Sequence, residues 1–296
     1  MAIRSITKLR LAAGHVKTVS EMETQFGKDL LRSPVSTITV GSITVDERLG
    51  NPEPHYGYDS ETRTSYNAVG LKNPGWKKFF PNKLKELINI ASKHDKQVVL
   101  SLAPIEPGQV EQMVKVISAM PYRTWVSRIQ LNGGCPNVSG HEVIAHDPEA
   151  IESLLSEIKP FTSLVDFEFK TSPQLSKSTL RKTVELCSEY GIKWIVSANT
   201  EKVDTPTGKD GNPYTGSPAC GKAGLPLFEQ NVEQVVVFSD YIRQTGADIK
   251  LVACGGIFSA EQLMTYADAG AVEAEMMTSV LENSPKVFQD ILMATV

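Results

Sequence analysis

The chain has 296 residues, 41% of them hydrophobic, and a formal net charge of −4 at pH 7. This length and composition suit one large core, and we expect a single domain over residues 1–296. Acidic and basic residues are dispersed and no apolar run is long enough to span a bilayer, so we expect neither a nucleic-acid-binding protein nor a membrane protein.

The N-terminus and the cysteines bear on the compartment. Residues 1–10 carry three basic residues but no apolar segment, so we do not expect a secretory signal. The four cysteines, at positions 135, 187, 220 and 254, lie far apart and form no C-x-x-C pair. We therefore expect no zinc, iron–sulfur or other metal site, and reduced thiols in a cytoplasmic protein are the simplest account.

Short apolar runs alternate with amphipathic stretches along most of the chain. We expect strands at residues 9–13, 34–45, 97–102, 125–131, 166–170, 193–197, 249–253 and 274–278. We expect helices from Thr18, where Glu21 completes a capping box, and at residues 82–94, 107–119, 147–158, 178–190, 231–245, 259–269 and 284–293. Two long loops, 46–75 and 198–225, interrupt the pattern, and ordered loops of that length are usually functional.

This alternation of about eight strands with helices predicts an α/β fold of the TIM (β/α)8 barrel type. The alternative is an open, doubly wound parallel sheet. In a closed barrel the chemistry lies at the carboxyl ends of the strands. The candidate functional residues are therefore those that follow each predicted strand.

The segment at residues 131–140, LNGGCPNVSG, follows one predicted strand. Two glycines allow a sharp turn, and the proline fixes the backbone just after it. We expect the Cys135 thiol to be held at the strand end between the amides of Asn132 and Asn137, where it could exchange a proton with a ligand. The alternative is a tight turn around a buried, inert cysteine.

Other strand ends also carry groups that suit a ligand. Lys170 could hold an anionic ring or phosphate, although a lysine that reaches back to solvent fits the sequence equally well. Gly255 and Gly256 precede a helix and could present N–H groups to a phosphate, or form an ordinary turn. Four amides would suit a small planar ligand with several N–H and C=O groups: Asn67, Asn132, Asn137 and Asn199.

Three motifs together resemble a known family. They are GNPEPHY at residues 50–56, NAVGLKN at 67–73 and NGGCPNVSG at 132–140. With them the chain resembles, over about residues 11–291, the class 1 dihydroorotate dehydrogenases, FMN-dependent (β/α)8 barrels of pyrimidine biosynthesis, and most closely the soluble class 1A form. The resemblance implies oxidation of dihydroorotate to orotate, FMN as cofactor, a small oxidant such as fumarate, and a homodimer.

The resemblance also implies roles for individual residues. Cys135 would be the general base that takes a proton from C5 of dihydroorotate while a hydride leaves C6 for N5 of FMN. Lys170 would lie beside the flavin pyrimidine and favour the negative charge of reduced flavin. The residues implied to surround the substrate are Asn67, Gly70, Leu71, Asn132, Asn137, Asn199 and Thr200. Those implied to surround FMN and its phosphate are Ala12, Gly14, Lys170, Ala198, Gly221, Gly255, Gly256 and Thr278.

The chain departs from the family pattern at several of these places. Gly41 stands where the family has a lysine that touches both flavin and substrate, and Met277 stands where it has a glycine beside the phosphate. Leu11 replaces an asparagine near the flavin, and His55 replaces an arginine. If the missing cation limits the site, Gly41→Lys is expected to raise activity.

The sequence leaves two functions open. The first is the FMN-dependent dihydroorotate dehydrogenase that the resemblance implies. The second is a diverged paralogue in the same fold that takes a different pyrimidine or carboxylate, or that holds FMN weakly or not at all. The departures at Gly41, Leu11 and Met277 motivate the second, and a flavin absorbance band in the purified protein would favour the first.

Overall fold

A computed structural model describes residues 5–121, 125–136 and 143–295 of the chain. Eight parallel strands close a barrel in the order β1-β2-β5-β6-β7-β8-β11-β12, and β12 pairs again with β1. The strands are β1 (Lys8–Leu11), β2 (Thr37–Ile43), β5 (Gln97–Leu102), β6 (Val126–Asn132), β7 (Phe167–Lys170), β8 (Trp194–Ser197), β11 (Lys250–Cys254) and β12 (Ala271–Met276). The predicted TIM (β/α)8 barrel is confirmed, and the open doubly wound sheet is wrong.

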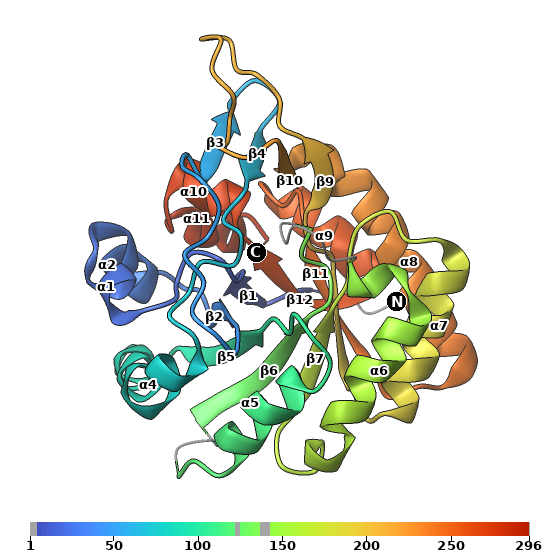
Figure 1. Cartoon of the computed structure of the whole chain (residues 1–296). Coiled ribbons are helices and arrows are strands. Elements are labelled where there is room, and N and C mark those ends of the chain that lie inside the picture. The colour runs from blue at the N-terminus through green and yellow to red at the C-terminus, as the bar shows by residue number, and fades with distance from the viewer. Residues whose placement is uncertain (1–4, 122–124, 137–142, 296) are drawn as a thin grey trace.

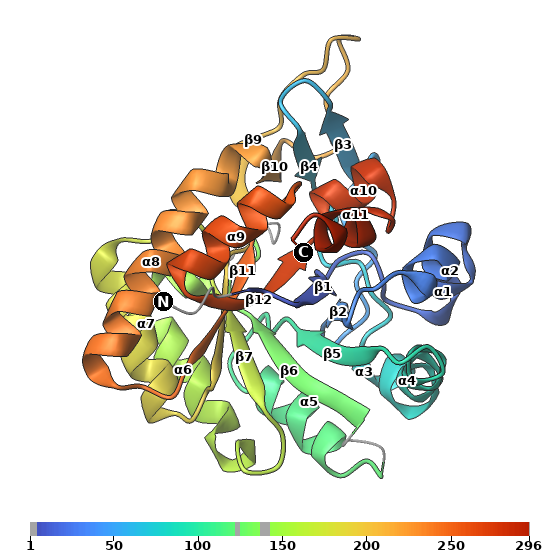
Figure 2. The ribbon, with the colours of Figure 1, turned by 180° about the vertical axis from the view of Figure 1, so that it is seen from behind.

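Helices surround the barrel (Figures 1 and 2). They are α1 (Val19–Glu23), α2 (Gln25–Arg32), α3 (Trp76–Lys78), α4 (Lys85–Ser92), α5 (Gln109–Ser118), α6 (Pro148–Ile158), α7 (Lys177–Glu189), α8 (Phe228–Thr245), α9 (Ala260–Ala269), α10 (Thr278–Asn283) and α11 (Val287–Met293). Their apolar faces pack against the strands in one core. Within the described ranges, no helix has the length and apolar character needed to cross a membrane.

Local signals at the helix starts explain much of this arrangement. The predicted capping box is present, because the Thr18 backbone N–H donates to Glu21 Oε2 at 2.6 Å. Ser176 caps α7 by accepting from the Thr179 N–H at 3.1 Å, and Asp147 caps α6 in the same way. Each cap satisfies an N–H group that the first helical turn leaves unpaired.

Two predicted boundaries near the chain ends need correction. The strand predicted at 274–278 ends earlier, as β12, and Thr278 instead begins α10, which the sequence did not predict. Helix α2 was also not predicted as a separate element. It begins after Thr24, whose side chain accepts from the Gly27 N–H at 3.1 Å.

Both predicted loops contain strands, so the loop prediction is wrong over four short segments. Strands β3 (Tyr56–Asp59), β4 (Thr64–Asn67), β9 (Glu201–Asp204) and β10 (Ala219–Gly224) form an antiparallel sheet in the order β3-β4-β10-β9. It lies at the top of Figure 1. We missed these strands because each has only four to six residues and carries little apolar alternation.

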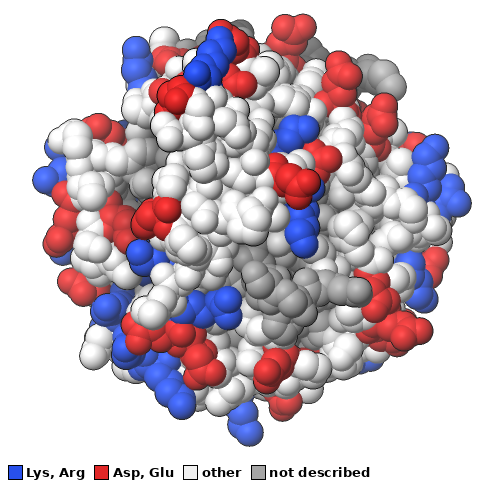
Figure 3. Space-filling model, turned by 45° about the horizontal axis from the view of Figure 1, so that its top comes forward, with Lys and Arg blue, Asp and Glu red and all other residues white. Residues whose placement is uncertain are grey.

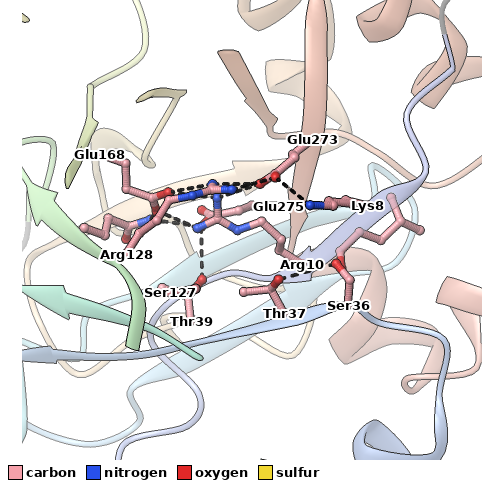
Figure 4. A network of polar contacts seen from close by, with 12 residues as sticks. Lys8, Arg10, Ser36, Thr37, Thr39, Ser127, Arg128, Glu168, Glu273 and Glu275 are labelled. Carbon is pink, nitrogen blue, oxygen red and sulfur yellow. Dashed lines mark hydrogen bonds and ion pairs between the residues drawn. The ribbon is translucent and has the colours of Figure 1, made fainter. Parts of the chain in front are cut away.

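The barrel interior contains charged side chains that contact one another (Figure 4). Arg10 is fully buried, and its guanidinium lies 2.9 Å from Glu168 Oε2 and 2.9 Å from Glu275 Oε1. Arg128 donates to Glu273 Oε1 at 2.7 Å. Buried charges of this kind are tolerated when each is paired and hydrogen-bonded, so the interior forms one polar network that crosses the barrel.

Charged side chains on the outer surface are mixed in sign. On the face seen in Figure 3, acidic and basic residues are interspersed. Exposed pairs such as Arg243–Asp240, with 3.2 Å between Nη1 and Oδ1, contribute little to stability. We therefore expect the charge that selects a ligand to lie inside the fold rather than on this surface.

Candidate active site

A cavity opens at the carboxyl ends of the barrel strands and is bordered on one side by β4 and β10. Its walls come from segments far apart in the chain, since the ends of seven barrel strands contribute to it: β1, β2, β6, β7, β8, β11 and β12. The predicted site residues that line it are Ala12, Gly14, Asn67, Gly70, Leu71, Asn132, Cys135, Lys170, Ala198, Asn199, Thr200, Gly255, Gly256 and Thr278. Asn137 lies outside the described residues.

The amide side chains in the cavity hold one another in place. Asn199 Nδ2 donates to Asn132 Oδ1 at 2.9 Å, and Asn132 Nδ2 donates to Ser42 Oγ at 2.8 Å. Asn199 Oδ1 accepts from the Thr200 N–H at 2.8 Å. Because each amide is fixed by a neighbour, the two asparagines present defined donor and acceptor edges to a ligand.

Gly221, which the resemblance implies to lie near FMN, is found beside Asn67 and Thr200. It lies on β10 and does not line the cavity. Its carbonyl accepts from Asn67 Nδ2 at 3.2 Å, and a Cβ at this position would lie only 2.2 Å from Thr200 Oγ1. Gly221 therefore positions Asn67 and leaves room for Thr200, and its contact with a cofactor stays a prediction.

Two glycines bring Cys135 to the cavity wall. A Cβ on Gly133 would lie 2.5 Å from the Phe169 ring, and one on Gly134 would lie 2.1 Å from the Thr171 carbonyl oxygen. Only glycine permits this close passage of the chain across β7. The Cys135 side chain is half-buried and lines the cavity, so the alternative of a buried, inert cysteine does not fit the structure.

Lys170 points into the barrel and not back to solvent. Its side chain is 6% exposed, and Nζ lies 2.9 Å from Glu275 Oε2. Burial opposes its charge, but Cys254 and Glu275 outweigh burial, so the pKa of Lys170 is raised. Burial also raises the pKa of Cys254, which leaves the thiol neutral at pH 7, so the Glu275 carboxylate is the anion that keeps Lys170 protonated.

The end of the cavity next to α8 is built around Gly255 and Gly256. Both have positive φ, +111° and +69°, and a Cβ on either would lie within 2.5 Å of α8 side chains. Glycine is therefore required at both positions. Met277 also lines the cavity, just before α10, at the position where the resemblance implies a glycine beside the phosphate.

The polar atoms that line the cavity fit a flavin. Gln130 Oε1 and Thr200 Oγ1 are buried, belong to residues that line the cavity, and have no partner among the described residues. Space is open beside Gly14, where an added Cβ would meet nothing within 4 Å. A planar ring with several N–H and C=O groups would satisfy the free atoms, while the cation of Lys170 would favour negative charge on such a ring.

The structure corrects the expectation for Gly41. Its φ is +118°, and a Cβ there would lie 2.5 Å from the Ser101 carbonyl oxygen. A lysine at this position would meet backbone that cannot move aside cheaply. Gly41→Lys is therefore expected to strain β2 and not to restore a cation to the site.

Several cavity residues were missed from the sequence. Lys17 and Tyr56 line the mouth, and Gln130 and Glu275 line the floor. One signal was available for Glu275: two glutamates, 273 and 275, stand two apart on a strand and so point to the same side. Lys17 carried no comparable signal, because it lies in an irregular segment between β1 and α1.

Comparison with known proteins identifies what the chain resembles. A family model described as dihydroorotate dehydrogenase matches residues 6–294. The catalytic subunit of dihydroorotate dehydrogenase B (NAD(+)) from Thermoplasma volcanium is 28% identical over 269 residues, covering 89% of this chain and 81% of the relative. The dihydroorotate dehydrogenase (quinone) of Clavibacter michiganensis is 24% identical over 251 residues, covering 84% of this chain and 71% of the relative.

A solved structure supports the same fold. The crystal structure of DHODH in complex with ferulenol from Eimeria tenella matches with a TM-score of 0.77 at 18% identity. The match covers 97% of this chain and 80% of that one. At this identity the likeness concerns the arrangement of the barrel.

Proposed function

Because the chain belongs to the dihydroorotate dehydrogenase family, and is an oxidoreductase of that family, we propose that it oxidises dihydroorotate to orotate with FMN in pyrimidine biosynthesis. The observation that carries the proposal is the cavity at the carboxyl ends of the strands. It brings Cys135, the linked amides of Asn132 and Asn199, and the buried cation of Lys170 to one space.

Cys135 is proposed as the general base. It would take the proton from C5 of dihydroorotate as the C5–C6 double bond forms. A thiol on a short, glycine-lined turn has little freedom, which suits a base that must meet one hydrogen. The two glycines before it make this placement possible.

The other residues are proposed to bind and orient. Asn67, Asn132 and Asn199 would hold the pyrimidine ring, with Asn137 as a further amide, while Gly70, Leu71 and Thr200 would complete the substrate pocket. FMN, when bound, would supply the acceptor for the hydride that leaves C6. The residues proposed to hold it are Ala12, Gly14, Lys170, Ala198, Gly255, Gly256 and Thr278.

The final electron acceptor is a separate question. The motifs favour a class 1A form that uses a small oxidant such as fumarate and forms a homodimer in the cytoplasm. None of the four cysteines, all of which lie within the described residues, forms a disulfide, which agrees with a reducing compartment. The relatives named above are instead NAD(+)- and quinone-linked proteins, so steady-state turnover with fumarate, NAD(+) and a soluble quinone would test the assignment.

One experiment tests the proposed reaction directly. An absorbance spectrum of the protein, supplied with FMN, is recorded before and after anaerobic addition of dihydroorotate. We expect a flavin band that bleaches. A flavin band that persists would support FMN as the cofactor and would contradict dihydroorotate as the substrate.

A second candidate function is a paralogue that has lost flavin binding. The Met277 side chain in the cavity favours it, since that side chain lies where a phosphate would be expected. The same spectrum decides, because a protein that takes up no added FMN would support this candidate. Met277→Gly should then restore FMN uptake if the side chain is the cause.

A further inference from the structure

The mouth of the cavity contains a cation that family motifs do not assign. Lys17 follows β1 and lines the cavity together with Cys135, Gly70 and Leu71. Its side chain is partly buried. It therefore lines the same cavity as the residues proposed to hold the substrate, and it lies close enough to Cys135 for the two to interact electrostatically.

The backbone around Lys17 is tied to the strand end at Gly41. The Gly14 N–H donates to the Gly41 carbonyl at 2.9 Å, and the Gly41 N–H donates to the Val16 carbonyl at 2.9 Å. Gly41 is the position at which the sequence lacks the expected lysine. Lys17 thus belongs to the segment that packs directly on that position, although it comes from a different part of the chain.

The neighbours of Lys17 leave its charge available. Glu21, the acidic residue whose charge acts on Lys17, has its Oε2 occupied by the Thr18 N–H at 2.6 Å and by the Lys17 N–H at 3.4 Å. Within the ranges that the structure describes, no carboxylate lies within ion-pair distance of the Lys17 ammonium. Lys72, in contrast, is 54% exposed and its Nζ lies 3.9 Å from Glu53 Oε1.

The pKa of Lys17 agrees with a partly buried cation that has no fixed carboxylate partner among the described residues. Burial lowers the pKa of Lys17 to about 8; Glu21 and Cys135 act against this, and Lys72 adds to it. An ammonium whose pKa is depressed by burial is stabilised when an anion binds beside it. The family resemblance implies that the backbone of Gly70 and Leu71 contacts the carboxylate of the substrate, and a carboxylate held there would be such an anion.

We propose that Lys17 binds the carboxylate of the substrate and supplies the cation that Gly41 does not. The inference rests on the proposed function, because the anion is the carboxylate of dihydroorotate or orotate. It identifies a substrate-binding residue that selects for a carboxylated ring over the same ring without that group.

The test compares two charge-removing variants of the FMN-loaded protein. Lys17→Met removes the cavity cation, and Lys72→Met removes a nearby lysine that does not line the cavity. Each protein is titrated with orotate and with uracil, which is the same ring without the carboxylate, and binding is followed by calorimetry. FMN affinity is measured in parallel as a check on the fold of the site.

We expect Lys17→Met to weaken orotate about tenfold to a hundredfold, as for loss of a charge-assisted contact. Its affinity for uracil and FMN should stay within about twofold of the parent, and Lys72→Met should change none of the three by more than that. Unchanged orotate affinity in Lys17→Met would overturn the inference. So would an equal loss for orotate, uracil and FMN, which would mark a structural role.

The two proposals fail in different ways. A parent protein that binds orotate, but whose flavin is not reduced by dihydroorotate, would remove the proposed reaction and leave the Lys17 contact to be judged by the variants. A parent that binds orotate no better than uracil would overturn the Lys17 contact, even if the flavin is reduced.

Discussion

The floor and the mouth of the cavity both contain lysines, but the two lysines differ in their partners. Lys170 on the floor is 2.9 Å from Glu275, which in turn lies 2.9 Å from Arg10. Lys17 at the mouth has no comparable ion pair within the described residues. A cation with a fixed carboxylate partner serves the fold and sets a local field, whereas one without such a partner is available to a ligand.

The difference extends to the residues around each lysine. The floor continues into a network of paired charges that fills the barrel (Figure 4). The mouth is made of turns, with positive φ at Gly70 (63°) and Leu71 (56°), and of the Cys135 segment. Changes on the floor should therefore affect stability most, and changes at the mouth should affect binding and reaction.

The largest expected effect is on the reaction, at Cys135. Cys135→Ser should slow reduction of bound FMN by dihydroorotate by about 10²–10⁴-fold, because a hydroxyl is a poorer base than a thiol at neutral pH. Rapid-mixing absorbance under anaerobic conditions measures the rate. Orotate affinity and the free energy of unfolding should change little, and an unaltered reduction rate would remove Cys135 from the mechanism.

A substitution on the floor of the cavity should instead change the free energy of unfolding. Glu275→Gln breaks a buried pair with Lys170 and another with Arg10, and should lower the free energy of unfolding by about 3–5 kcal/mol. Urea denaturation measures this. Asp240→Asn, which breaks an exposed pair with Arg243, is the control and should cost less than about 1 kcal/mol. Equal losses in the two variants would contradict the special role of the floor.

The contribution of Glu275 to the free energy of unfolding should depend on pH in a defined direction. Burial opposes the Glu275 charge, but Lys170 and Arg10 outweigh it, so the folded protein lowers the pKa of Glu275. The stability that this carboxylate contributes is present above its unfolded pKa of about 4.3 and is lost as pH falls through the folded value. The difference between the parent and Glu275→Gln should therefore shrink in acid.

A smaller effect is expected at the strand end next to the mouth. Gly41→Ala should cost about 2–3 kcal/mol, because φ is +118° and the new Cβ would lie 2.5 Å from the Ser101 carbonyl. Gly108→Ala is a matched control, with φ of +80° and nothing within 4 Å, and should cost about 1 kcal/mol from the backbone alone. Equal melting temperatures for the two variants would argue against the close approach at Gly41.

The smallest effect is the pH dependence of orotate binding at the mouth. Lys17 loses its proton above a pKa of about 8, in surroundings that include Glu21, Lys72 and Cys135. Since only the charged form attracts a carboxylate, affinity should be full below that value and fall by about tenfold between pH 7 and pH 9. Calorimetric titrations across this range measure it, and Lys17→Met should show a flatter profile.

The features that could be predicted from the sequence are those that depend on the local pattern of residues. The alternation of strands and helices predicts the barrel, and the Thr18–Glu21 capping box is confirmed. The end of β6 and its two glycines predicted where Cys135 would lie. These features follow from residues close together in the chain, so they could be read without knowing the packing.

The features that the sequence did not predict depend on contacts between distant segments. Glu275 is a partner for Lys170 across the barrel, and the pairing is visible only once β7 and β12 are placed. The need for glycine at Gly41 comes from the Ser101 backbone on a neighbouring strand. The second sheet joins two segments that the sequence presents as unrelated loops.

That second sheet has a consequence for the order in which the molecule assembles. Asn67 on β4 pairs with Gly221 on β10, and half of the barrel, strands β5 to β8, lies between them in the chain. Pairing over such a separation carries a large closure entropy until the barrel has already brought the two segments together. The wall of the cavity should thus be among the last parts to form, and its backbone amides should exchange with solvent before those of the strands beneath it.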